Sequence, residues 1–223
     1  MNTRVRNVII RMVISIIVFI YISYLAWKSL PRSDFMVIMA FFALFLGWSI
    51  IEMLIYKDPD TVAVEDEDRR SYLFLQLSSL LALFYALIDF LDYHHYTRMW
   101  SFEPWIIYAG FLVFILNTIL RYNAITTLGK YYNPRVAIYQ EHSLVTTGVY
   151  KKIRHPMYLS ALLNIVAIAF IFSSWGTLLI MLFAVLPAVI YRINIEEEFL
   201  LTRLGNEYQQ YLEKSKKIIP GIW

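Results

Sequence analysis

The chain has 223 residues, of which 59% are hydrophobic and 17% are charged, and its net charge at pH 7 is +3. Soluble domains have about 45–50% apolar and about 25% charged residues, so this composition excludes a soluble enzyme, a collagen and a disordered chain. It indicates an all-α integral membrane protein. The absence of cysteine excludes disulfides, thiolate metal sites and cysteine nucleophiles. The small net charge gives no reason to expect a nucleic-acid partner.

Four apolar segments within residues 1–120 are predicted to span the bilayer, since a spanning helix needs about 20 such residues. They are Met12–Trp27, Phe35–Tyr56, Ser71–Leu91 and Pro104–Leu120. The basic start of the first segment also fits a signal peptide, but no small-residue cleavage site follows it, so we predict a retained span. The segment Asp58–Arg70, acidic in its middle, is interpreted as a solvated loop.

A run of 35 residues without a charge, Met157–Tyr191, follows in the C-terminal half. A single helix of this length would extend for about 50 Å, well beyond a hydrocarbon core of about 30 Å. The turn-forming residues Ser173–Gly176 lie near its middle, so we predict a helical hairpin that supplies spans five and six. A kink at Gly176 in one tilted helix is the alternative. After the hairpin, Ile193–Lys217 has apolar residues at three- and four-residue spacing, which predicts an amphipathic cytoplasmic helix.

The positions of Lys and Arg predict the orientation of these spans. With both termini in the cytoplasm, only Lys28, Arg32 and Arg98 of the 20 basic residues lie on the opposite side. This orientation needs an even number of spans, which agrees with the hairpin. We expect one integrated membrane domain, in which residues 1–120 form N-terminal helices and residues 121–223 form a catalytic half at the cytoplasmic face. The adjacent His94 and His95 have no evident third ligand, so no metal site is expected.

Two polar segments flank the predicted hairpin, Gly148–Tyr158 before it and Arg192–Glu198 after it. Because the hairpin returns the chain to the same face, the two segments become neighbours. Pro156 disfavours a helical His155 and itself suits the first position of a helix. His155 therefore lies at a helix N-terminus, where unpaired N–H groups attract carboxylates and phosphates. A basic helix cap that faces lipid head groups is the alternative.

Arg192 and Glu196 are four residues apart and share one helix face where a span meets the cytoplasm. Ionisable groups at this depth are costly unless paired, which favours a functional role. The alternative is a simple ion pair between neighbouring turns, with the Arg192 side chain extended to the membrane surface.

Together these segments carry a recognisable pattern. The sequence HSLVTTGVY begins at His142 and RHPMY ends at Tyr158; Arg192, Glu196, Glu197 and the sequence GNEY that ends at Tyr208 follow the hairpin. In this order they resemble the signature of the isoprenylcysteine carboxyl methyltransferase family, which is grouped with phospholipid methyltransferases. The resemblance covers residues 121–220. One departure is Ser160, where the family usually has glycine.

The resemblance implies a six-helix membrane methyltransferase that binds S-adenosyl-L-methionine at the cytoplasmic face. By position, the cofactor site would comprise Gly148, Val149, Tyr150, His155, Tyr158 and Glu197. Arg192 and Glu196 would lie next to the reacting group as the catalytic pair. The residue types fit, because a helix N-terminus suits the carboxylate of the cofactor, glutamate its ammonium, and tyrosine rings its adenine and sulfonium. Methyl transfer from a sulfonium needs neither a metal nor a covalent enzyme intermediate.

The acceptor is expected to be a small or lipid-like molecule that reaches the site from the bilayer, with no obligate protein partner. A carboxylate acceptor is already an anion at pH 7 and would be held by Arg192. An amine or thiol must lose a proton, which would make Glu196 a general base. Two other functions remain as alternatives: a membrane reductase related to sterol reductases, which would use NADPH, and a catalytically silent membrane scaffold.

Overall fold

The protein is described by a computed structural model that covers residues 3–55, 65–66, 69–91, 99, 104–132, 137–138 and 143–219. Most of the acidic loop 58–68 and the pair His94–His95 lie outside these residues. The described part is helical, apart from a two-residue antiparallel pairing of β1 (Glu65–Asp66) with β2 (Ala137–Ile138). The prediction of an all-α fold is therefore confirmed for the described part of the chain.

The helices have these bounds: α1 Thr3–Ser29, α2 Arg32–Ile55, α3 Ser71–Leu91, α4 Pro104–Leu128, α5 Pro156–Ile171, α6 Trp175–Ile180, α7 Leu186–Leu204 and α8 Asn206–Lys214. Two short 3₁₀ helices, η1 (Gly129–Tyr131) and η2 (Gly148–Lys151), lie between α4 and α5. A π-helical stretch, η3 (Met181–Val185), joins α6 to α7, so the three segments form one continuous helix.

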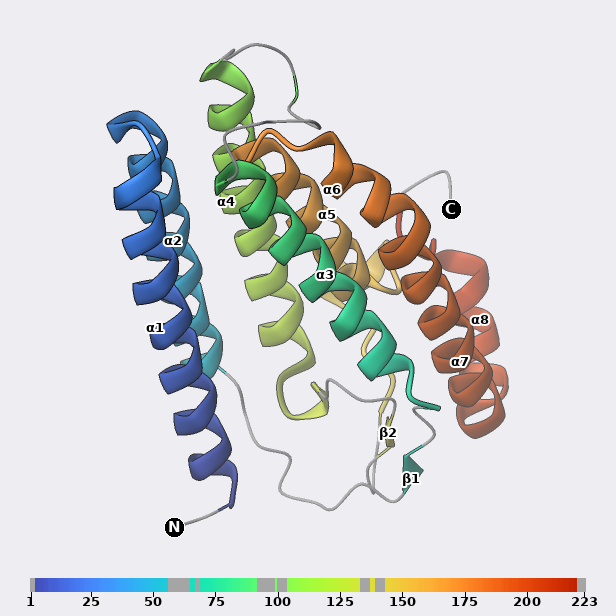
Figure 1. Ribbon diagram of the computed structural model, residues 1–223. Helices are drawn as coiled ribbons and strands as arrows, with labels where there is room; N and C mark the ends of the chain where they lie inside the picture. Colours follow the sequence, from blue (N-terminus) through green and yellow to red (C-terminus); the bar gives the residue numbers. More distant parts are fainter. Residues whose placement is uncertain are drawn as a thin grey trace.

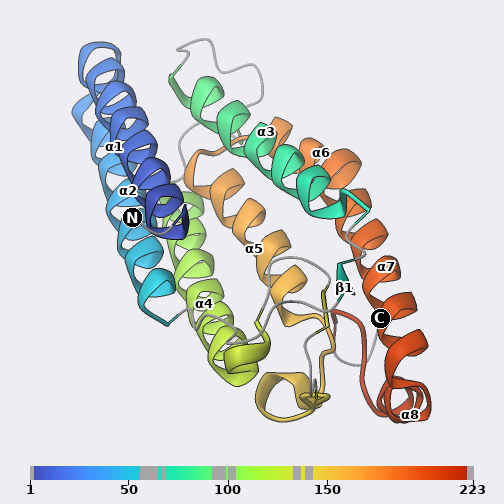
Figure 2. The same ribbon diagram turned by 90° about the horizontal axis from the view of Figure 1, so that it is seen from below.

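The long helices form three layers, which the two ribbon views show (Figures 1 and 2). The α1–α2 pair lies on one side, α4 and α5 lie in the middle, and α3 packs with α6 and α7 on the other side. The starts of α3 and α5 and the ends of α4 and α7 meet at the lower end of Figure 1. That end therefore gathers the polar segments on both sides of the hairpin.

The turn of the hairpin lies where the sequence predicts it. The chain reverses at Phe172–Ser174, and the Ser174 side chain accepts a hydrogen bond from the Thr177 backbone N–H to begin α6. Phe172 packs in the core, with its ring centroid 4.9 Å from that of Phe41 on α2 and 5.3 Å from that of Phe90 on α3. The turn thus fixes the hairpin against two helices of the N-terminal half.

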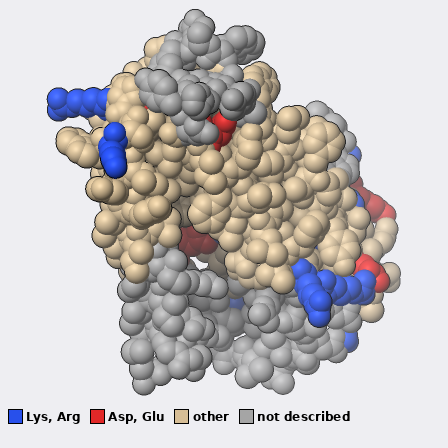
Figure 3. Space-filling model, viewed as in Figure 1, with Lys and Arg blue, Asp and Glu red and all other residues tan. Residues whose placement is uncertain are grey.

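The surface is suited to lipid. Large apolar side chains such as Trp27, Leu54 and Phe183 are more than 70% exposed, and the face in Figure 3 consists mostly of uncharged residues between its upper and lower ends. Among the described residues, four helices are long and apolar enough to cross a membrane: 32–55, 71–91, 104–131 and 175–204. Residues 16–29 and 156–171 form shorter apolar helices, so the count of six spans stays a prediction.

The predicted amphipathic helix Ile193–Lys217 is wrong in its boundaries. Helix α7 continues without a break through Arg192 to Leu204, because nothing between Tyr191 and Ile193 interrupts helical hydrogen bonding. Gly205 then ends it with φ +52°, a left-handed conformation that glycine adopts readily. The nine-residue helix α8 follows, with Tyr208 and Tyr211 buried.

Candidate active site

A cavity of about 220 Å³ lies at the lower end of the helices, between α3, α4, α5, α7 and α8. Five of the eight predicted site residues line it: Tyr150, His155, Tyr158, Arg192 and Glu196. Apolar side chains of the membrane helices, including Leu75, Met157, Ala161 and Leu200, form another part of its wall. The cavity thus has a polar part and an apolar part.

His155 caps the N-terminus of α5, with Pro156 at the first helical position, as the sequence predicts. Its side chain is buried, and the ring stacks on that of Tyr158 with 5.5 Å between centroids. The Tyr158 hydroxyl donates a hydrogen bond to Glu196 Oε2. His155 Nδ1 lies 3.7 Å from the same oxygen. The predicted residues on α5 and α7 are therefore in direct contact.

Glu197 is surrounded by three basic side chains. Arg154 Nε lies 2.9 Å and His155 Nε2 3.2 Å from Glu197 Oε1, while Lys217 Nζ lies 3.0 Å from Oε2. The Glu197 side chain is only 12% exposed and does not line the cavity. Its contacts hold Arg154 and His155, which do line it. Direct contact of Glu197 with a cofactor stays a prediction.

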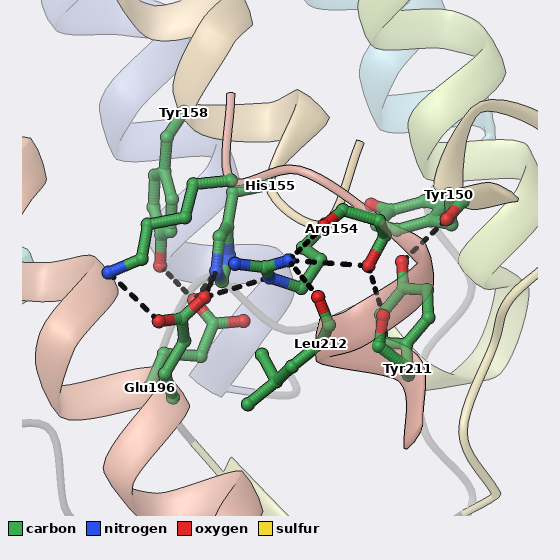
Figure 4. A network of polar contacts seen from close by, with 10 residues as sticks. Tyr150, Arg154, His155, Tyr158, Glu196, Tyr211 and Leu212 are labelled. Atoms are coloured by element: carbon green, nitrogen blue, oxygen red, sulfur yellow. Dashed lines mark hydrogen bonds and ion pairs between the residues drawn. The ribbon is translucent and has the colours of Figure 1, made fainter. Parts of the chain in front are cut away.

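The residues after α8 complete this network. The Arg154 guanidinium donates through Nη1 to the carbonyls of Leu212 and Ser215, and the Arg154 and His155 backbone N–H groups donate to the carbonyls of Lys216 and Lys217 at 2.8 and 3.0 Å. Figure 4 shows the side chains of Arg154, His155, Tyr158 and Glu196 converging there. The segment before α5 is thus fixed by the segment after α8.

Gly148 and Val149 have structural roles near the cavity. Gly148 has φ +56°, and a Cβ added to it would lie 2.9 Å from Thr127 Oγ1 of α4. Glycine therefore allows η2 to approach α4 closely in a left-handed conformation. The Val149 carbonyl accepts hydrogen bonds that close the 3₁₀ turn. Neither residue lines the cavity, and any contact with a cofactor stays a prediction.

Two buried tyrosine hydroxyls in the cavity wall have no hydrogen-bond partner among the described residues: those of Tyr150 and Tyr208. Burial, followed by the negative charge of Glu196, raises the pKa of both phenols well above the ordinary value, so both remain neutral donors. A buried unsatisfied hydroxyl is costly, which is explained if a bound molecule or water supplies the missing partner. Tyr208 was not among the site residues that the sequence predicted.

Other lining residues come from the N-terminal half and from α4. Tyr72 belongs to α3, and Arg121 near the end of α4 forms a two-pronged ion pair with Glu52 of α2, at 2.7 and 3.0 Å. The Tyr132 hydroxyl also donates to Glu52, at 3.4 Å. The sequence contains a signal for this ion pair, because Glu52 is the single charged residue of its predicted span and a charge at that depth needs a partner.

Comparison with known proteins agrees with this geometry. The family model of the isoprenylcysteine carboxyl methyltransferase family matches residues 109–202. The chain is 31% identical over 155 residues to protein-S-isoprenylcysteine O-methyltransferase B of Arabidopsis thaliana, covering 66% of this chain and 79% of that protein. It is 28% identical over 150 residues to a probable protein-S-isoprenylcysteine O-methyltransferase of Oryza sativa subsp. indica, covering 64% and 76%.

The fold is also known. The solved structure of the eukaryotic intramembrane Ras methyltransferase, an isoprenylcysteine carboxyl methyltransferase, matches with a TM-score of 0.53 and 22% identity, covering 98% of this chain and 86% of that one. The fold and the relatives define a class, the integral-membrane methyltransferases, for which S-adenosylmethionine is the methyl donor. Within that class, the chain belongs to the isoprenylcysteine carboxyl methyltransferase family. Membership of this family supports the predicted methyltransferase function over the alternative of an NADPH-dependent reductase.

Proposed function

We propose that the protein transfers the methyl group of S-adenosylmethionine to the carboxylate of a lipid-modified cysteine or a similar amphipathic acid, which enters the cavity from the bilayer. The observation that carries this proposal is the position of Arg192. Its side chain is 3% exposed, yet it lines a cavity that also contains two unsatisfied tyrosine hydroxyls. The similar proteins of Arabidopsis and rice are named as O-methyltransferases of isoprenylcysteine, which favours a carboxylate acceptor.

The donor side of the site is proposed to lie around Tyr150, His155 and Tyr208. The Tyr150 and Tyr208 hydroxyls, which have no partner among the described residues, offer two hydrogen-bond donors, and the positive end of the α5 dipole at His155 favours a carboxylate. S-Adenosylmethionine supplies an already activated methyl group. The protein therefore needs to orient the two reactants and exclude water, and positioning of this kind supplies much of the rate.

The acceptor side is proposed to lie between Arg192 and the apolar wall. Arginine holds a carboxylate through two parallel hydrogen bonds, so it orients the attacking oxygen without removing a proton. Tyr158 separates this region from His155 and fixes Glu196 through its hydroxyl. The neighbouring apolar side chains of Leu75, Met157 and Leu200 suit the hydrocarbon part of the acceptor.

An amine or thiol acceptor is the second candidate, and one contact favours it. The Tyr158 hydroxyl donates a hydrogen bond to Oε2 of Glu196. The Glu196 side chain is 30% exposed and lines the cavity. Its other oxygen, Oε1, is then the atom that would accept a proton from such an acceptor. The two candidates predict different products, an ester in the first case and an N- or S-methyl compound in the second.

The test is methyl transfer in lipid nanodiscs, with radiolabelled S-adenosylmethionine and a farnesylated cysteine that carries either a free carboxylate or a carboxamide. Esters release methanol in alkali, whereas N- and S-methyl products do not. We expect alkali-labile label with the free acid alone. Label that resists alkali would instead support the second candidate. Calorimetric titration with S-adenosylmethionine and with NADPH runs in parallel, and binding of NADPH alone would overturn both candidates.

A further inference from the structure

The first turn of α3 forms part of the site, although α3 lies outside the residues 109–202 that the family model matches. Arg192 Nη1 donates a hydrogen bond of 2.8 Å to Ser71 Oγ, and both side chains are buried. The Arg192 Cζ atom lies 5.5 Å from the ring centroid of Tyr72. A residue pair on α3 therefore contacts the guanidinium that the proposed function places on the acceptor.

Aromatic rings from two helices contact the same guanidinium. Tyr158 of α5 lies 5.8 Å from Arg192 Cζ, in addition to Tyr72 of α3. Contacts between a guanidinium and an aromatic face are stronger when the groups are shielded from water. An arginine side chain has many rotamers, so an arginine without such contacts would sample many orientations. Here Ser71, Tyr72 and Tyr158 restrict it.

The backbone that leads into α3 is strained. Arg69 and Arg70 have φ values of +44° and +59°, and neither is glycine. A left-handed conformation is sterically unfavourable for such residues. Arg69 also forms an exposed ion pair of 3.2 Å with Glu198 of α7. Strain of this kind persists where surrounding contacts hold it, and it clusters at functional sites. The start of α3 is thus held against the helix that carries Arg192.

We propose that Ser71 and Tyr72 are positioning residues for methyl transfer: they orient the Arg192 guanidinium toward the acceptor. This inference rests on the proposed function, because it acts through Arg192. It adds a role for the N-terminal half, which so far supplied membrane helices. Orientation of a catalytic group affects turnover more than binding of the methyl donor, which the proposed function puts on the other side of Tyr158.

The test compares kcat, KM for each substrate and affinity for S-adenosylmethionine in the full-length protein. Ser71→Ala is expected to lower kcat by about tenfold or more, since it removes a hydrogen bond to a charged group. Tyr72→Leu is expected to lower kcat by a similar factor, since it removes a contact between the guanidinium and an aromatic ring that is shielded from water. Affinity for the methyl donor should stay within about twofold. Ser71→Thr, which keeps the hydroxyl, and Tyr72→Phe, which keeps the ring, should restore most of the turnover.

Ser78→Ala is the matched control, because Ser78 is a buried serine of the same helix whose hydroxyl donates to the Leu75 carbonyl of its own helix and, among the described residues, has no contact with Arg192. It should leave kcat unchanged. In an Arg192→Lys background, Ser71→Ala should add little further loss, since residues that act as a unit are not additive. A full additional loss there, or parallel losses of kcat, donor affinity and thermal stability, would overturn the inference.

The outcomes also separate this inference from the proposed function. If Arg192→Ala retains turnover, the acceptor role of Arg192 is wrong and the proposed function must change. If Arg192→Ala abolishes turnover while Ser71→Ala and Tyr72→Leu remain within twofold of the wild type, only the positioning role is wrong. Reduced turnover in all three, with donor affinity unchanged, supports both.

Discussion

Replacement of Glu197 by glutamine tests the network behind the cavity. The carboxylate lies within 3.2 Å of Arg154, His155 and Lys217, and its side chain is 12% exposed. Removal of one partner from a buried ion pair costs about 3–5 kcal/mol. Glutamine keeps one acceptor oxygen, so we expect a loss near the lower limit, about 3 kcal/mol. At about 2–4 °C per kcal/mol for a chain of this size, the midpoint of thermal unfolding should fall by about 6–12 °C.

The assay is thermal unfolding in detergent at one scan rate, combined with calorimetric titration with S-adenosylmethionine. Glu198→Gln is the matched control, because the adjacent Glu198 pairs with Arg69 at side-chain exposures of 62% and 49%. Exposed pairs contribute about 0–1 kcal/mol, so this variant should unfold close to the wild type. Glu197→Gln should also weaken the binding of S-adenosylmethionine, because Arg154 and His155 would be displaced. Equal midpoints for the two variants would refute the reasoning.

Three further predictions concern Gly148, which lies near the cavity, and two tyrosines of the cavity wall. Gly148→Ala should lower stability by about 1–2 kcal/mol more than Gly129→Ala in thermal unfolding, because both glycines have φ +56° but only Gly148 would bring its Cβ against Thr127. Tyr208→Phe should leave the unliganded protein as stable as the wild type or slightly more stable, since its hydroxyl lacks a partner, yet weaken donor binding by up to about tenfold in calorimetry. Burial raises the pKa of Tyr211 to about 12, so its contribution to stability is complete below about pH 10, the ordinary phenol pKa, and is lost as pH rises toward 12. A Tyr211→Phe variant should show a smaller decrease in unfolding midpoint over that interval, and an equal decrease would contradict the assignment.

Much of the architecture follows from local sequence patterns. The span Ser71–Leu91, the hairpin turn near Ser173 and the helix start at Pro156 agree with the structure, because apolar length and Pro or Ser signals act over a few residues. The boundary after Tyr191 was wrong for the opposite reason. A change from apolar to charged residues marks the membrane surface, but it does not end a helix whose backbone hydrogen bonds continue to Gly205.

The site was predicted only where its residues are close in the sequence or joined by the hairpin. His155, Tyr158, Arg192 and Glu196 come together because α5 and α7 are the two arms of that hairpin. Ser71 is 121 residues from Arg192, and no pattern in one sequence reports such a pairing. Glu197 shows a different limit: its residue type suits an ammonium ligand, but the hairpin brings Arg154 and His155 to it, and the return of the chain after α8 adds Lys217.

The contacts between the segment before α5 and the segment after α8 can form only late in synthesis. Arg154 and Ser215, which are in contact, are 61 residues apart, and the whole hairpin together with α8 lies between them. Chains emerge from the ribosome starting at the N-terminus, so the membrane helices are available for insertion before Lys216 and Lys217 can pair with the backbone of Arg154 and His155. The nascent protein therefore enters the bilayer without a finished site. The site for the methyl donor is therefore complete only after translation has passed Lys217 and the hairpin has been inserted.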